Sequence, residues 1–236
     1  MTKAAILIDG GYFLKRLPTV RPDVDRANPA QVAKSIGQLV YNHLDQLNKV
    51  AYAQNCHALL YRCFFYDATP YVNKGHLPVS RRSIDYAKSA EARFRLGLFE
   101  ALRKRPNFAV RLGEVVRERA WVLNEGAQIA LLKGERTVAE LTDDDFAPGF
   151  RQKAVDMRIG IDIASLTLKK QVDTIVLVAG DADFVPAAIL ARREGVRIIL
   201  DPLWRNVSAG LFEHIDGLRS GFAGPKRSAA PPMNEA

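Results

Sequence analysis

The chain has 236 residues, 48% of them apolar, and its 34 Lys and Arg residues against 26 Asp and Glu residues give a net charge of +8. This composition is sufficient for one sizeable hydrophobic core, and it excludes a mostly disordered chain, a collagen and a coiled coil. The apolar runs, such as residues 174–179, fall far short of the roughly 20 residues that a membrane helix needs. The run at residues 4–8 is also too short for a signal peptide, so we expect a cytoplasmic protein.

The first half of the chain alternates apolar runs with amphipathic segments. Residues 4–8 are continuously apolar and end at Asp9-Gly10-Gly11, a pattern typical of a central parallel strand that stops at a tight turn. Apolar residues at helical spacing predict a helix over 29–48. A second buried strand is expected at 58–66, and a long basic helix at 83–105 that Pro106 closes.

The second half continues this alternation after an irregular stretch. Residues 107–133 hold β-prone segments, including 121–132, which predict two or three short strands and an edge hairpin. The later segments predict, in order, a buried helix at 154–168, a strand at 173–180, a helix at 184–194, a strand at 196–200 and a last helix at 208–218. Short strands that alternate with helices indicate an α/β fold around a mostly parallel sheet.

Three aspartates follow two of the predicted strands. Asp9 ends the first strand, and Asp181 and Asp183 come directly after the strand at 173–180. Because ligands of such sheets bind at the carboxyl ends of the strands, these acids are candidate site residues. The alternative for each is a helix cap.

Two further aspartates lie in the apolar helix at 154–168. Asp156 and Asp162 are six residues apart, which separates them by roughly 120° around a helix. The alternative for Asp162 is a salt bridge to Arg158.

The scattered histidines and two lone cysteines show no metal-ligand spacing, so any metal site must be built from carboxylates. Clustered carboxylates repel one another unless a cation lies among them. Mg²⁺ or Mn²⁺ suits such oxygen ligands and commonly serves phosphate chemistry.

Four motifs occur together in a characteristic order. They are Ile8-Asp9-Gly10-Gly11-Tyr12-Phe13, Tyr66-Asp67-Ala68, Lys153-Ala154-Val155-Asp156 with Asp162 six residues on, and Gly180-Asp181-Ala182-Asp183-Phe184-Val185-Pro186. Over about residues 3–220 the chain resembles the LabA-like branch of the NYN domain family, which belongs to the PIN-like nuclease superfamily. Many NYN domains carry Asn two residues after the glycine that follows the first Asp, where this chain has Tyr12.

The resemblance implies a three-layer α/β/α Rossmann-like sandwich, an acidic pocket that binds Mg²⁺ or Mn²⁺, and ribonuclease activity. By position, Asp9, Asp162, Asp181 and Asp183 would be the metal ligands, and Asp156 would be a further catalytic acid. The NYN domain would span residues 1–221 with a small β-hairpin insertion at about 107–150. Residues 222–236 are rich in Gly, Pro, Ala and Ser, and we expect them to form a disordered tail.

The positive charge is concentrated in one region. Residues 81–119 hold 11 Lys and Arg against 5 Asp and Glu, so they account for +6 of the net +8. Such a patch would bind the phosphates of RNA, or it would serve only as a solvated surface. The candidate contacts are Arg81, Arg82, Lys88, Arg93 and Arg95, with Lys153 for the scissile phosphate and Tyr12 for stacking on a base.

Three functions compete. The first is a metal-dependent endoribonuclease that acts on RNA, more readily single-stranded. The second is a regulatory protein that binds nucleic acid with little or no turnover. The third, a phosphatase, is disfavoured because no second acid lies two residues after Asp9. No membrane partner is expected, and self-association into a homo-oligomer stays open.

Overall fold

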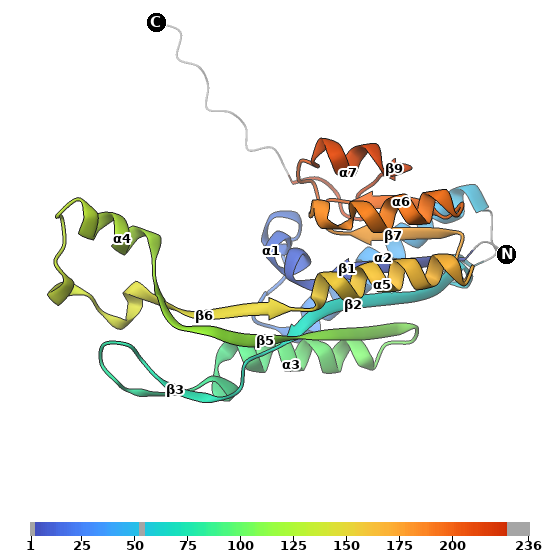
Figure 1. Ribbon diagram of the computed structural model, residues 1–236. Coiled ribbons are helices and arrows are strands. Elements are labelled where there is room, and N and C mark those ends of the chain that lie inside the picture. The colour runs from blue at the N-terminus through green and yellow to red at the C-terminus, as the bar shows by residue number, and fades with distance from the viewer. Residues whose placement is uncertain (1–2, 52–54, 226–236) are drawn as a thin grey trace, which may run out of the picture.

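The computed structural model describes residues 3–51 and 55–225 of the chain. Within these residues, seven strands form one sheet in the order β6-β5-β2-β1-β7-β8-β9 (Figure 1). They are β1 (Ala4–Asp9), β2 (Leu60–Thr69), β5 (Phe108–Leu123), β6 (Phe146–Lys153), β7 (Thr174–Val178), β8 (Arg197–Asp201) and β9 (Gly217–Leu218). Neighbouring strands run parallel except β5 with β6, which confirms the predicted mostly parallel sheet.

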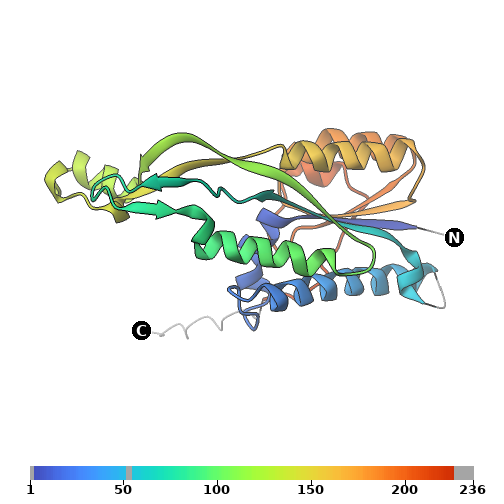
Figure 2. The ribbon, with the colours of Figure 1, turned by 90° about the horizontal axis from the view of Figure 1, so that it is seen from below.

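Helices cover both faces of this sheet, as Figure 2 shows. One face carries α1 (Gly10–Val20), α2 (Pro29–Ala51) and α3 (Ala90–Arg103), and the other carries α5 (Val155–Leu168), α6 (Val185–Arg193) and α7 (Ala209–Glu213). Strand β1 contributes to both cores, since Ile6 and Ile8 pack toward one set of helices and Ala5 and Leu7 toward the other. Burial on both faces explains the continuous apolar run and confirms the three-layer sandwich.

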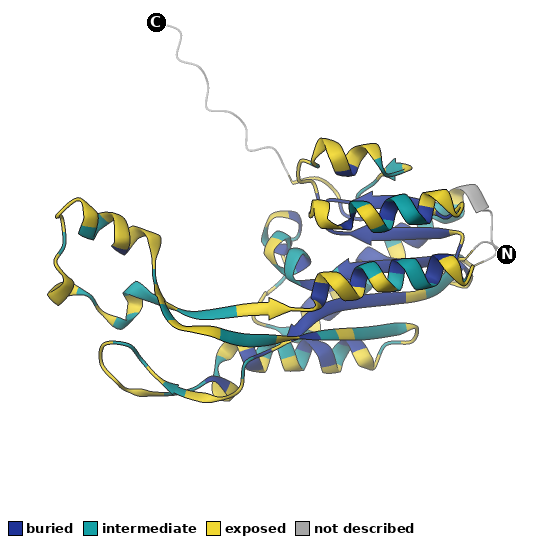
Figure 3. Cartoon of the chain, viewed as in Figure 1, coloured by how far each residue is buried: buried dark blue, intermediate teal, exposed yellow. Residues whose placement is uncertain are grey.

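The edge of the sheet extends into a long arm. We define the arm as the projecting parts of β5 and β6, the helix α4 (Glu125–Leu132) between them, and the adjacent hairpin of β3 (Lys74–His76) and β4 (Ser83–Asp85). Figures 1 and 2 show it reaching well beyond the carboxyl ends of the central strands. Its residues are mostly exposed or half-buried, whereas the central strands are buried (Figure 3).

The predicted hairpin insertion is confirmed, but its details differ. The hairpin consists of one strand of 16 residues and one of 8, rather than two or three short strands. The expected strand at 121–132 stops at Leu123, and α4 follows. The Asn124 side-chain amide donates a hydrogen bond of 2.9 Å to the Asp144 carbonyl, and the Asn124 backbone N–H donates one to the Asp145 carbonyl. These bonds turn the chain out of the strand.

The expected basic helix at 83–105 is shorter than predicted. Residues 83–85 form β4, Tyr86–Lys88 form the 3₁₀ turn η2, and only then does α3 begin. The side chain of Asp85 accepts a hydrogen bond from the Ala87 N–H, and Ser89 Oγ accepts one from the Ala92 N–H. These side chains offer the backbone alternative partners and so interrupt the helix.

The expected last helix also ends early. Helix α7 stops at Glu213 because the Asp216 carboxylate accepts hydrogen bonds from the Ile198 N–H of β8 and from the Arg192 guanidinium of α6. No helix in the described part of the chain is long and apolar enough to span a membrane.

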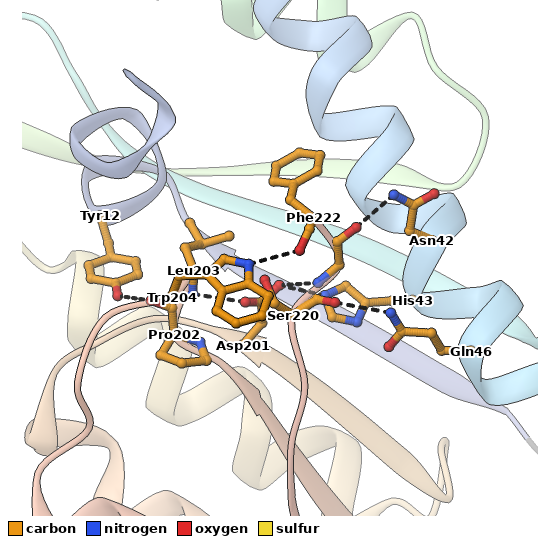
Figure 4. A network of polar contacts seen from close by, with 11 residues as sticks. Tyr12, Asn42, His43, Gln46, Asp201, Pro202, Leu203, Trp204, Ser220 and Phe222 are labelled. Atoms are coloured by element: carbon orange, nitrogen blue, oxygen red, sulfur yellow. Dashed lines mark hydrogen bonds and ion pairs between the residues drawn. The ribbon is translucent and has the colours of Figure 1, made fainter. Parts of the chain in front are cut away.

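The chain remains ordered beyond the predicted start of the disordered tail. Phe222 is buried and packs on Phe13, and its carbonyl accepts a hydrogen bond of 2.8 Å from Trp204 Nε1. The buried pair of His43 and Asp201 lies beneath this segment, and Asp201 also accepts from the Gly221 N–H (Figure 4). A tail beginning at residue 222 is therefore incorrect, and residues 226–236 lie outside the described part.

Candidate functional site

The order in which the chain adds strands to the sheet reverses between β1 and β7. From β1 the chain continues to β2 on one side, whereas β7 continues to β8 on the other. In open parallel sheets, ligands bind in the crevice at the carboxyl ends of two such strands. Asp9 is the last residue of β1, and Asp181 follows shortly after β7. Both acids therefore lie at this edge.

Asp9 is a largely buried acid that caps helix α1. Its Oδ1 accepts a hydrogen bond of 3.0 Å from the Tyr12 N–H. Burial, together with the charges of Asp156 and Asp67, raises the pKa of Asp9 to about 6 against the opposing effect of the hydrogen bond from the Tyr12 N–H. An acid with this pKa is largely ionised at neutral pH and can still exchange a proton.

Three exposed aspartates lie on other segments at this edge of the sheet. Asp156 lies in the first turn of α5, which the chain enters through Ala154 in a left-handed conformation with φ of 65°. Its pKa is raised by partial burial and then by the charges of Asp181 and Asp183. Asp181 caps the 3₁₀ turn η5 (Ala182–Phe184), accepting 3.1 Å from the Asp183 N–H. We call Asp9, Asp156, Asp181 and Asp183 the acidic group, because the charge of Asp156 acts on Asp9 and the charges of Asp181 and Asp183 act on Asp156.

The structure does not bring Asp162 into this group, which differs from the sequence prediction. Six residues along α5 from Asp156 correspond to about 9 Å and roughly 120° of rotation. Asp162 instead accepts a hydrogen bond of 2.9 Å from the Tyr66 hydroxyl. It forms an ion pair of 3.2 Å with Arg111 rather than with Arg158. Asp156 is therefore the helix acid that shares the crevice with Asp9.

The sequence analysis placed Asp67 in one of the four motifs but did not identify it as a site residue. This side chain is fully buried beside Asp9, since Asp9 pairs with the preceding residue Tyr66 across β1 and β2. Its Oδ1 accepts from the Ala68 N–H and pairs with Arg95, whereas its buried Oδ2 has no partner among the described residues. Burial raises the pKa of Asp67, and Arg95 opposes this. Its place near the end of a predicted strand was the available signal.

Carboxylate oxygens are suitable ligands for a hard divalent cation, but in this structure these side chains are too far apart to bind one together. Within residues 3–51 and 55–225, no three Asp, Glu, His or Cys side chains are grouped closely enough to hold a metal ion. Carboxylate oxygen is nevertheless the ligand that Mg²⁺ and Mn²⁺ prefer. Asp156, Asp181 and Asp183 are exposed, so rotation of their side chains could bring them toward Asp9. The residues present fit such an ion by their chemistry.

Two predicted RNA contacts are occupied within the protein. The Tyr12 hydroxyl donates a hydrogen bond of 2.5 Å to the Pro202 carbonyl (Figure 4), and the Tyr12 ring lies against Gly180. Tyr12 therefore fastens α1 to the loop after β8 and is not available for stacking on a base. Arg95 is mostly buried and pairs with Asp67 and Glu91, so most of its charge neutralises a buried acid.

The other predicted cations are exposed. Arg81 and Arg82 lie on the hairpin of the arm, Lys88 ends η2, and Arg93 lies in the first turn of α3. Lys153 ends β6 close to Asp156 and pairs with Glu118 at 3.3 Å. Of these cations, Lys153 lies three residues before Asp156, whereas Arg82 lies on the hairpin loop beside Asp143 and Asp144 of the arm.

Comparison with known proteins gives one family match. The sequence profile of the NYN domain matches residues 89–203, just under half of the chain. The match supports an NYN domain and, at a coarse level, a nuclease-related function on nucleic acid. No curated protein matches the sequence.

Two solved structures are distantly similar. One is a crystal structure of a protein of unknown function from Vibrio parahaemolyticus, with 15% identity, a TM-score of 0.45 and coverage of 94% of this chain and 95% of that one. The other comes from work on the mechanism and regulation of Sir2 enzymes, with 12% identity, a TM-score of 0.32 and coverage of 92% of this chain and 86% of that one. Neither likeness is close enough to support an inference.

Proposed function

We propose that this chain is an NYN-domain protein of the LabA-like type and acts as a Mg²⁺- or Mn²⁺-dependent endoribonuclease. The observation that carries the proposal is the acidic group of Asp9, Asp156, Asp181 and Asp183 at the crevice between β1 and β7. Within it, the charge of Asp156 raises the pKa of Asp9, and the charges of Asp181 and Asp183 raise the pKa of Asp156. Uncompensated carboxylates are costly to bring together, which favours a role in binding a cation. The partial NYN match agrees with this chemistry.

The chain's own residues would divide the work. Asp156, Asp181 and Asp183 would hold the cation with Asp9, and the cation would neutralise phosphate charge and lower the pKa of a bound water. As a ligand, Asp9 would be held ionised by the cation, which opposes the rise that burial gives to the pKa of its carboxyl. Exposed Arg81, Arg82, Lys88 and Arg93 would bind backbone phosphates without regard to sequence. Lys153 would reach the scissile phosphate if it left Glu118.

A cleavage assay tests the proposal. Purified protein is incubated with end-labelled single-stranded RNA, or with circular RNA, in Mn²⁺ or in EDTA. We expect Mn²⁺-dependent products from both RNAs, since an endonuclease needs no free end. Asp181→Asn should reduce cleavage by at least 100-fold, whereas Asp144→Asn, an exposed aspartate of the arm, should leave it unchanged. Undiminished cleavage by Asp181→Asn would refute the assigned site.

The alternative is an RNA-binding protein without turnover. The open spacing of the carboxylates favours it, since no three of them are grouped closely enough to hold an ion within residues 3–51 and 55–225. It predicts RNA binding that weakens steeply with salt and yields no product in Mn²⁺. The same assay, with a binding measurement, separates the two functions.

A further inference from the structure

A cavity of about 420 Å³ lies at the base of the arm, between the start of α3 and the hairpin of β5 and β6. Three aromatic side chains form one wall. The ring centroids are 4.8 Å apart for Tyr71 and Phe150, 5.1 Å for Tyr86 and Phe150, and 5.3 Å for Tyr71 and Tyr86. Tyr71 and Phe150 are only half-buried, so their rings present apolar surface to a flat ligand.

This cavity borders the acidic crevice. Gln152 lines it and also extends over Gly11, where a Cβ would lie 3.8 Å from Gln152 Oε1 and 3.5 Å from Asp9 Oδ1. The Gln152 amide and the Asp9 carboxylate therefore approach the same glycine. A group bound in the cavity would lie next to one bound at Asp9.

The remaining lining supplies polar groups at the rim. Arg95 and Glu91 line the cavity, and their mutual ion pair, together with Asp67, holds the guanidinium in place. The Gln152 amide adds both a donor and an acceptor. The Tyr86 hydroxyl is buried and has no hydrogen-bond partner among the described residues. Aromatic faces with a few donors and acceptors suit a planar heterocycle with a polar edge.

We propose that this cavity, which we name the base pocket, binds one unstacked nucleobase of single-stranded RNA next to the phosphodiester at Asp9. The orientation relative to Asp9 rests on the proposed nuclease function. Stacking on Tyr71 and Phe150 would supply affinity, and Gln152 would contact the edge of the base. Exposed Arg93 and Lys88 lie near the pocket on α3 and η2, where they can bind the flanking phosphates.

The test uses a fluorescent seven-nucleotide single-stranded oligoribonucleotide and seven versions of it, each with one abasic nucleotide. Binding to the full chain is measured by anisotropy in EDTA. For the wild type, one internal abasic position should weaken binding by about tenfold, because one base then loses its stacking surface. Tyr71→Leu should weaken binding of the intact oligonucleotide by a similar factor, and the abasic nucleotide should then cost nothing more.

Further variants test whether weaker binding comes from the loss of a contact or from loss of the fold. Tyr71→Phe keeps the ring and should bind like wild type. Gln152→Ala, on an exposed side chain, should weaken binding several-fold without a change in melting temperature. Tyr41→Leu removes an exposed aromatic ring from α2, away from the arm, and should keep both the affinity and the abasic effect.

The outcomes separate this proposal from the nuclease. An abasic effect of equal size in wild type and Tyr71→Leu, or no binding of the oligonucleotide at all, overturns the base pocket. Cleavage in Mn²⁺ that depends on Asp181, without any such coupling, leaves the nuclease standing and removes the pocket. Coupling at Tyr71 without cleavage supports the pocket and removes the nuclease.

Discussion

Replacing Asp9 with Asn is expected to stabilise the folded protein above pH 6. Burial raises the pKa of the Asp9 carboxyl from 3.8 to about 6, so the folded chain binds this proton more tightly than the unfolded chain does. The contribution of Asp9 to stability is therefore fully present below pH 3.8 and is lost as the pH rises through 6. Asn carries no charge at any of these pH values.

The size of the effect follows from the shift of the pKa. A rise from 3.8 to about 6, at about 1.36 kcal/mol for each unit, corresponds to about 3 kcal/mol at pH 7.5. The Asn side-chain oxygen can still accept the hydrogen bond from the Tyr12 N–H, so the cap of α1 is kept. For a chain of this size the gain corresponds to roughly 6–12 °C in melting temperature.

Thermal unfolding followed by circular dichroism between pH 4 and 8, in EDTA, measures this effect. The melting temperatures of wild type and Asp9→Asn should separate as the pH rises from 4 to about 6 and then stay apart by a constant amount. Asp144→Asn, on the exposed arm, should follow the wild type throughout. If Asp9→Asn is as stable as the wild type at pH 7.5, or less stable, the inference of a desolvated acid at this site is wrong.

Three contacts in the fold give further predictions, each measured by urea denaturation. Gly180→Ala should cost about 1–3 kcal/mol, because a Cβ there would overlap the Tyr12 ring; an unchanged midpoint would contradict this packing. Arg95→Met should cost about 3–5 kcal/mol by leaving Asp67 buried without its cation, and a neutral result would show that Asp67 is not charged. Phe222→Ala should cost about 3–5 kcal/mol because Phe222 is buried. If this segment were a disordered tail, the substitution would leave the free energy of unfolding unchanged.

The central elements could be predicted because their signals are local. Strands β1, β7 and β8 are buried on both faces, so each is a short continuous apolar run that differs from the amphipathic pattern of a helix such as α2. An acid directly after such a run lies at the carboxyl edge of a parallel sheet. The sequence alone therefore determined the fold class and the position of Asp9, Asp181 and Asp183 at that edge.

The rest depended on contacts between distant segments. Apolar residues at 121–132 suit a strand or a helix, and the partners of Asn124 determine where the strand of the arm ends. Which helix acid joins Asp9 depends on the rotation and rise of α5, which selects Asp156 and turns Asp162 toward Tyr66 and Arg111.

The local sequence pattern also does not show whether an arginine side chain is exposed to solvent or pairs with a buried carboxylate. Arg95 and Arg93 are two residues apart on α3, yet one neutralises Asp67 inside the protein and the other is exposed. Net charge and spacing predict a basic region, because these are properties of the chain. Only tertiary structure decides which charges remain free, since burial and pairing bring together residues that the sequence holds far apart.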